Sequence, residues 1–170
     1  MGFVLLLGGA RSGKSDLAVR LASESGSPVT FIATAAPGDR EMTDRIERHR
    51  SDRPSGWKTV EARLDLQGAI NATEGGDYIV IDCLTLWVSN MLEDGRPPEE
   101  ISLTADRVVD ELTHRRAVVV SNEVGLGIVP DNELARRFRD ALGSVNSRFA
   151  ACADRALLLV AGHAISLERP

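Results

Sequence analysis

The sequence predicts an α/β protein with a mostly parallel β-sheet, helices on both faces of that sheet and an antiparallel strand at one edge. A glycine-rich phosphate-binding pattern stands between an apolar run and an amphipathic stretch near the N-terminus. Apolar β-type runs then recur with helical segments between them, which is typical of parallel strands joined by crossover helices. Near the C-terminus only Gly162 and His163 separate the last two runs, and so short a connection permits a hairpin but no crossover.

The first apolar run, residues 3–7, is expected to be a buried strand that leads into a phosphate-binding loop. The residues that follow fit the pattern G-x-x-x-x-G-K-[ST]: Gly8, Gly9, Ala10, Arg11, Ser12, Gly13, Lys14 and Ser15. Glycines in such a loop let backbone N–H groups turn toward phosphate oxygens. Lys14 supplies a positive charge for the β- and γ-phosphates, and the Ser15 hydroxyl can complete a Mg²⁺ shell.

A helix is expected directly after the loop, because Leu17, Ala18, Leu21 and Ala22 share one helical face. Gly26 is expected to end it. The alternative for the loop is an ordinary glycine turn that binds nothing. The order of strand, loop and helix favours phosphate binding, and the positive end of the helix would point at the same anion.

The remaining elements follow from the same reading of periodicity. Strands are expected at residues 29–33, 58–60, 78–82, 117–121 and 157–161, with an antiparallel edge strand at 164–167. One helix is expected after Pro97-Pro98, marked by Val108, Val109 and Leu112. A longer amphipathic helix is expected after Pro130-Asp131, with apolar residues at 134, 138, 142, 145 and 149.

Composition limits the class of protein. The 170 residues are 43% hydrophobic and 26% charged, which suits a soluble globular protein. The length favours one domain, so residues 1–170 are expected to form a single domain that carries the phosphate loop. The net charge of −5 argues against a nucleic-acid partner. Cys83 and Cys152 show no zinc-binding spacing, so reduced thiols and a cytoplasmic location are expected. No apolar run approaches transmembrane length, so no membrane insertion is expected.

Asp82 stands at the end of the strand that reads Ile-Val-Ile-Asp. In phosphate-loop proteins an acidic residue at the end of a neighbouring strand holds Mg²⁺. Asp82 and Ser15 are therefore the predicted metal residues. The alternative is that Asp82 caps a following helix.

Residues 39–53 carry five arginines and five acidic residues, and His49 lies among them. Arg45 and His49 are four positions apart and would share a helical face. Such a histidine could face bound phosphates, and imidazole is a competent nucleophile toward phosphorus. The alternative is a solvated helix with internal ion pairs and a surface histidine. His114 and His163 have no comparable setting and are expected to be structural or solvated.

The sequence resembles the adenosylcobinamide kinase/adenosylcobinamide-phosphate guanylyltransferase family over essentially its whole length. Besides the phosphate loop, the resemblance is carried by residues 31–35, Arg45-Ile46, His49-Arg50, Arg53-Pro54, Trp57, Glu61, the run Asp82-Cys83-Leu84-Thr85-Leu86-Trp87, Ser89-Asn90, Ser121-Asn122-Glu123-Val124-Gly125, Gly127 and Val129-Pro130. The phosphate loop alone is generic. The joint presence of Asp-Cys-Leu-Thr-Leu-Trp and Asn-Glu-Val-Gly-x-Gly is specific.

The resemblance implies a bifunctional enzyme of cobalamin biosynthesis with a RecA-like sheet, assembled as small homo-oligomers and trimers in particular. ATP or GTP would phosphorylate adenosylcobinamide. His49 would then attack the α-phosphorus of GTP, and GMP would pass from histidine to adenosylcobinamide phosphate, giving adenosylcobinamide-GDP. Besides the loop residues, the resemblance implies a GTP site lined by Ala33, Thr34, Ala35, Arg50, Ser51, Asp52, Arg53, Glu61 and Asp82.

Two other classes of protein are alternatives. A phosphate-loop kinase of another small hydroxyl substrate would need no covalent intermediate, and His49 would be dispensable. A GTPase switch would carry an Asn-Lys-x-Asp element, but the two lysines, Lys14 and Lys58, do not follow an asparagine. The corrinoid site stays open, with Trp57, Trp87 and residues 125–130 as candidates that could equally be packing or turn residues.

Overall fold

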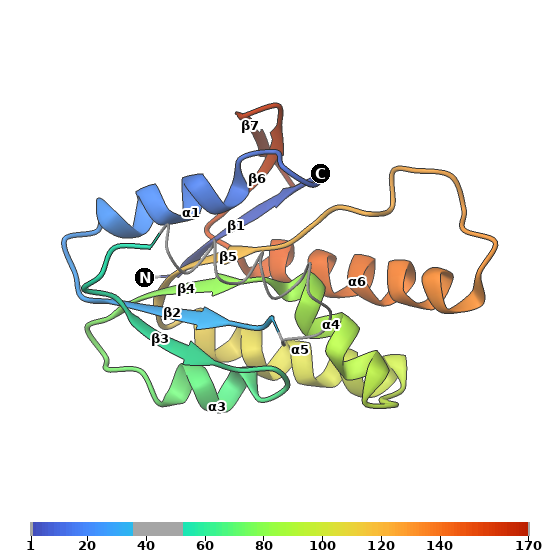
Figure 1. Cartoon of the computed structure of the whole chain (residues 1–170), viewed down its shortest axis with the longest axis horizontal. Coiled ribbons are helices and arrows are strands. Elements are labelled where there is room, and N and C mark those ends of the chain that lie inside the picture. Colours follow the sequence, from blue (N-terminus) through green and yellow to red (C-terminus); the bar gives the residue numbers. More distant parts are fainter. Residues whose placement is uncertain (1, 36–52, 170) are drawn as a thin grey trace.

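The computed structural model describes residues 2–35 and 53–169, and these form a seven-stranded sheet in the order β3-β2-β4-β5-β1-β6-β7 (Figure 1). The strands are β1 (Phe3–Gly8), β2 (Val29–Ala33), β3 (Lys58–Glu61), β4 (Tyr78–Asp82), β5 (Arg116–Val120), β6 (Arg155–Val160) and β7 (His163–Leu167). The pairs are parallel except for β6 with β7. The predicted α/β class, with its antiparallel edge strand, is confirmed.

The β6–β7 hairpin has the short turn that the sequence predicts. Val160 pairs with His163, so β7 begins one residue earlier than expected. Ala161 and Gly162, the two turn residues, have positive φ angles of 50° and 80°. Two left-handed residues match the right-handed twist of the flanking strands, which is why the chain can reverse here in so short a space.

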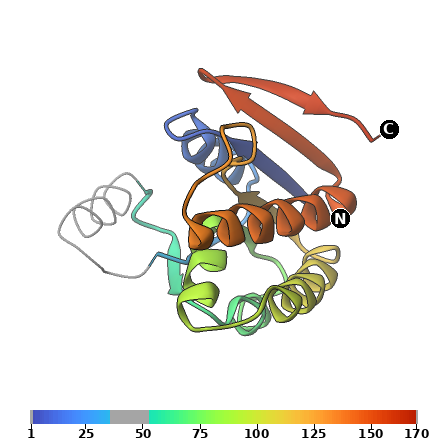
Figure 2. The same ribbon diagram turned by 90° about the vertical axis from the view of Figure 1, so that its right-hand side faces the viewer.

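Helices cover both faces of the sheet. They are α1 (Lys14–Ser23), α3 (Leu66–Asn71), α4 (Leu84–Glu93), α5 (Pro98–Leu112) and α6 (Glu133–Cys152). Figure 2 shows α1 on one side of the sheet and α3 to α6 on the other. Successive side chains of β1 point to opposite faces of the sheet, so one strand contributes to both helical layers. Leu6 packs with α1, whereas Leu5 and Leu7 pack with the helices on the other face.

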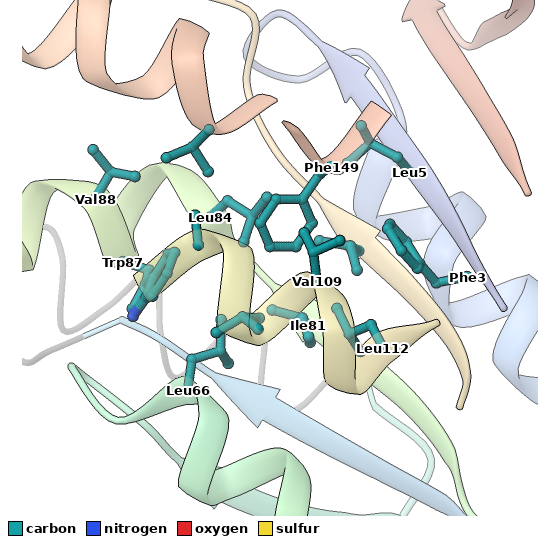
Figure 3. Packing of buried hydrophobic residues seen from close by; sticks show 14 of the residues in the cluster. Phe3, Leu5, Leu66, Ile81, Leu84, Trp87, Val88, Val109, Leu112 and Phe149 are labelled. Carbon is teal, nitrogen blue, oxygen red and sulfur yellow. The ribbon is translucent and has the colours of Figure 1, made fainter. Parts of the chain in front are cut away.

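The larger core lies between the sheet and helices α3 to α6 (Figure 3). Phe3 and Phe149 meet edge to face with ring centroids 5.9 Å apart. Trp87 is completely buried, and its indole Nε1 donates to the carbonyl oxygen of Leu64 at 2.9 Å. A buried side chain of this size contributes about 1.5–3 kcal/mol relative to an exposed one, so this layer supplies much of the stability of the fold.

Two helices are absent from the sequence-based expectation, and both have a physical reason. Helix α4 buries Thr85 and Asn90 as well as the face that carries Trp87, so burial extends over several sides and no clean amphipathic period results. Helix α3 has only six residues and contains Gly68, which leaves little pattern to recognise. The three predicted helices are present: α1 directly after the loop, α5 with Pro98 in its first turn, and α6 with Asn132 as its side-chain cap.

Candidate active site

The phosphate loop lies at the carboxyl edge of the sheet, between β1 and α1. Gly13 precedes α1 with a φ of 94°, in the left-handed region that favours glycine. A Cβ at Gly8 would collide with the carbonyl oxygen of Leu159 on β6. Gly13 is therefore required by its backbone conformation, and Gly8 is required by close packing against the neighbouring strand. Ligands of open α/β sheets bind at this edge.

Lys14 holds the loop together from within. Only 6% of Lys14 is exposed, and its Nζ donates to the carbonyl oxygens of Gly8 at 2.9 Å and Gly9 at 2.6 Å. It also donates to Ser12 Oγ at 3.3 Å. A buried ammonium held beside glycine-rich backbone is a preformed charge for a phosphate group.

Ser15 and Asp82 meet across the sheet edge, as the predicted metal site requires. The Ser15 hydroxyl donates to Asp82 Oδ2 at 3.1 Å, although the two residues come from different elements. The capping alternative for Asp82 fails, because the residue before α4 is Cys83 and no side chain caps that helix. Residues 2–35 and 53–169 contain no cluster of three or more His, Cys, Asp or Glu side chains that could hold a metal. A cation bound by Ser15 and Asp82 would therefore need oxygens from phosphate and water.

The residues expected to line a GTP site converge at the ends of three neighbouring strands. Ala33 on β2 pairs with Glu61 on β3 and with Asp82 on β4. Arg53 places its guanidinium carbon 3.5 Å from the ring centroid of Phe31 on β2, a cation–π contact. Positions distant in the sequence are thus brought to one edge of the sheet.

Thr34 has a structural role at this edge. It is fully buried, and its Oγ1 donates to the carbonyl oxygen of Cys83 at 2.7 Å. The same Oγ1 accepts from the Cys83 amide at 2.8 Å. Asn90 Nδ2 donates to the Thr34 carbonyl at 2.8 Å, which ties the end of β2 to α4. Thr34 therefore fixes the backbone beside Asp82, while Ala35 follows it at the end of the described segment.

The predicted nucleophile lies outside the described residues. His49, Arg45, Arg50, Ser51 and Asp52 all fall between residues 35 and 53. Their predicted roles stay predictions. The chain leaves the described part just after β2 and re-enters it at Arg53, so both junctions are near the same strand.

The segment after β5 is an additional part of the site that sequence reasoning quoted only as a motif. The Asn122 amide donates to Thr85 Oγ1 at 2.7 Å, and the Glu123 amide donates to the Gly8 carbonyl at 3.1 Å. Ser121 Oγ donates to Asn146 Oδ1 at 2.7 Å, and Asn146 Nδ2 donates to the Asn122 carbonyl at 3.0 Å. The detectable signal was a run of polar residues directly after a buried strand at the carboxyl edge.

The candidate corrinoid residues have different surroundings. Trp87 is part of the core, and Trp57 is half-buried against the α1 side of the sheet. The segment after Glu123 instead exposes Leu126 by 84% and Ile128 by 97%. A pocket of about 340 Å³ lies elsewhere, between the start of α3 and α5, with Arg96 and Arg107 in its lining. His114 and His163 are exposed, as expected for solvated histidines.

Comparison with protein families identifies the chain. The family described as cobinamide kinase / cobinamide phosphate guanyltransferase matches residues 4–167. The chain belongs to this family. It is 43% identical over 169 residues to the bifunctional adenosylcobalamin biosynthesis protein CobP of Pseudomonas aeruginosa, covering 96% of each chain. It is 38% identical over 180 aligned positions to the bifunctional adenosylcobalamin biosynthesis protein CobU of Salmonella typhimurium, covering 97% of this chain and 99% of that one.

Solved structures with little sequence similarity share the fold. A prototypical ATPase from the type III secretion system of pathogenic bacteria aligns with a TM-score of 0.58 at 10% identity, over 94% of this chain and 51% of that chain. The ATPase EscN of enteropathogenic E. coli aligns with a TM-score of 0.63 at 11% identity, over 94% and 43% respectively. The chain thus spans about half of these ATPases or less. The likeness confirms the predicted RecA-like phosphate-loop fold.

Proposed function

We propose that this protein phosphorylates adenosylcobinamide with ATP or GTP and then transfers GMP from GTP to the product, giving adenosylcobinamide-GDP. The observation that carries the proposal is the assembly of Lys14, Ser15 and Asp82 at one edge of the sheet, in a chain that matches this family from residue 4 to residue 167. In this proposal Lys14 would neutralise phosphate charge, and Ser15 and Asp82 would hold Mg²⁺ together with water and phosphate oxygens.

The second activity is proposed to run through His49. Neutral imidazole would attack the α-phosphorus of GTP, a P–N bond would form, and the bond to pyrophosphate would break. The phosphate group of adenosylcobinamide phosphate would then attack the same phosphorus and release His49. Splitting one displacement into two lets GMP be passed on, because the P–N bond is labile. Lys14 and nearby arginines would stabilise the charge that develops on pyrophosphate.

The proposed GTP site combines residues that the structure describes with residues from the segment between 35 and 53. Ala33, Glu61 and Asp82 stand at adjacent strand ends, which supports their predicted part in that site. Arg50, Ser51 and Asp52 lie beyond the described residues and belong to the proposal on the family resemblance alone. A homotrimer is also part of the proposal.

No helix in the described parts of the chain is long and apolar enough to cross a membrane.

The experiment that tests the proposal supplies cobinamide, ATP and GTP in separate combinations. With ATP alone, the expected product is cobinamide phosphate. With ATP and GTP together, the expected product is cobinamide-GDP, and mass spectrometry separates the two. Formation of cobinamide phosphate without any cobinamide-GDP would favour the alternative function, a phosphate-loop kinase in which His49 forms no covalent intermediate. Absence of both products would contradict the proposed function.

A further inference from the structure

Glu123 is held directly beside the lysine of the phosphate loop. The carbonyl oxygen of Gly8 accepts one hydrogen bond from Lys14 Nζ at 2.9 Å and another from the Glu123 amide at 3.1 Å. Two donors on one oxygen cannot be further apart than the sum of these distances. The backbone of Glu123 is therefore a neighbour of the ammonium group that contacts the β- and γ-phosphates of a bound nucleotide.

The residue before Glu123 is hydrogen-bonded to two different helices, which fixes the position of Glu123. Its chain neighbour Asn122 is tied to Thr85 on α4 and, through Asn146, to α6. Asn146 itself is 4% exposed, so this anchor is built into the protein interior. A residue held by a buried network keeps its geometry without help from substrate, which is what a catalytic group requires.

The carboxylate of Glu123 keeps one oxygen available. Its Oε1 accepts from the Gly125 amide at 2.6 Å, which holds the side chain against its own loop. In residues 2–35 and 53–169, Oε2 has no hydrogen-bond or ion-pair partner, and the residue is half-buried. An ionised carboxylate with one anchored and one open oxygen can accept a proton from a substrate hydroxyl.

Other carboxylates at this edge are less suited to that task. Asp82 accepts from Ser15 and is the predicted metal residue. Glu61 ends β3, which is separated from β1 by β2, β4 and β5. Asp16 lies in the first turn of α1 and is exposed. Among these carboxylates of residues 2–35 and 53–169, Glu123 combines partial burial and contact with the phosphate loop with an oxygen that is not engaged by Ser15.

We propose that Glu123 is the general base of the phosphorylation step, an inference that rests on the proposed kinase activity. The substrate hydroxyl oxygen attacks the γ-phosphorus while its proton passes to the carboxylate of Glu123. The bond between the γ-phosphorus and the bridging oxygen breaks, and the nucleoside diphosphate leaves with that electron pair. Neither half of GMP transfer requires this base, because the nucleophiles are an imidazole and a phosphate oxygen that is already ionised.

The test compares Glu123→Gln with wild type in both half-reactions. Glutamine keeps an oxygen that can accept from the Gly125 amide, so the loop anchor is retained and only proton acceptance is lost. The expected result is a fall in kcat for cobinamide phosphorylation of about 10²- to 10⁴-fold. The KM for ATP, the magnesium titration and the uptake of GMP from GTP should stay at wild-type values.

Two further variants complete the test. Glu123→Asp keeps a carboxylate and should retain more phosphorylation than Glu123→Gln. Asp16→Asn removes a nearby exposed carboxylate and should phosphorylate cobinamide like the wild type. Wild-type kcat in Glu123→Gln, equal losses in Gln and Asp variants, or a large loss in Asp16→Asn would each overturn the proposal. Failure of the wild type to phosphorylate cobinamide would instead refute the proposed function itself.

Discussion

At the scale of single residues, the sequence predicts the phosphate-binding chemistry because that chemistry is local. Gly8 to Ser15 are contiguous, so their pattern specifies the loop without knowledge of the fold. Asp82 could be predicted because a strand-terminal acid has a known relation to such a loop. The proposed role of Glu123 could not be predicted, since it depends on the shared carbonyl of Gly8, a contact between the ends of two paired strands that are distant in the sequence.

The pairing of Ser15 with Asp82 leads to a prediction on magnesium. Asp82→Asn keeps the size of the side chain and its ability to accept from Ser15, but it deletes the charge that holds a cation. We expect the magnesium concentration needed for half-maximal phosphorylation to rise by at least about tenfold, a loss of about 1.4 kcal/mol in affinity. An unchanged magnesium titration would show that Asp82 is only a structural acid.

The two cysteines are expected to differ in reactivity. Burial, and next the nearby charge of Asp82, raise the pKa of the Cys83 thiol to about 11, whereas Cys152 is exposed. A raised thiol pKa disfavours the thiolate, which is the reactive form. In native protein at pH 9, iodoacetamide should modify Cys152 first, and mass spectrometry should find Cys83 intact. Equal rates at both positions would contradict this picture of the site.

At the scale of elements, the strands and the long helices could be predicted but α3 and α4 could not. Parallel strands buried on both faces give continuous apolar runs, and α6 has one clear apolar face. Helix α4 is buried on several sides by α6, α5 and the sheet, and tertiary packing then replaces the amphipathic pattern. Residues 84–87 belong to the sequence motif shared with the family, and Trp87 is a core residue of α4.

Trp87→Phe tests that structural role. Phenylalanine fills most of the volume but removes the indole N–H, which leaves the Leu64 carbonyl without this donor. We expect the free energy of unfolding to fall by about 1–3 kcal/mol, measured by urea denaturation. Trp57→Phe is the matched control, and its half-buried position predicts a smaller loss. A changed KM for cobinamide with unchanged stability would instead assign Trp87 to substrate binding.

At the scale of the whole molecule, apolar surface remains exposed beside the phosphate loop and on the edge hairpin. Large exposed apolar side chains are found on the segment between β5 and α6, in the first turn of α6, and on β6 and β7: Val124, Leu126, Ile128, Val129, Leu134, Val160, Ile165 and Leu167. Exposed apolar side chains gathered into a contiguous patch mark an interaction surface. These exposed side chains support the proposed homo-oligomer.

The proposed trimer gives a prediction on mass. Light scattering should report three times the 18.3 kDa of one chain. Leu126→Asp together with Ile128→Asp would place two charges in an apolar contact, so this double variant should shift toward the single-chain mass. Leu103→Asp is the control, because Leu103 is 60% exposed but lies on α5. A wild-type protein that runs as a single chain would contradict the trimer.

The proposed mechanism places both a phosphate loop and a covalently guanylylated histidine in one chain. The most direct measurement incubates the protein with GTP labelled at the α-phosphate, denatures it and counts retained label. Wild-type protein should retain GMP in an adduct that is lost in acid and stable in base, as expected for a P–N bond. His49→Ala should retain none, and His114→Ala should behave like the wild type. Label retained by His49→Ala, or a wild-type adduct that survives acid, would contradict the account.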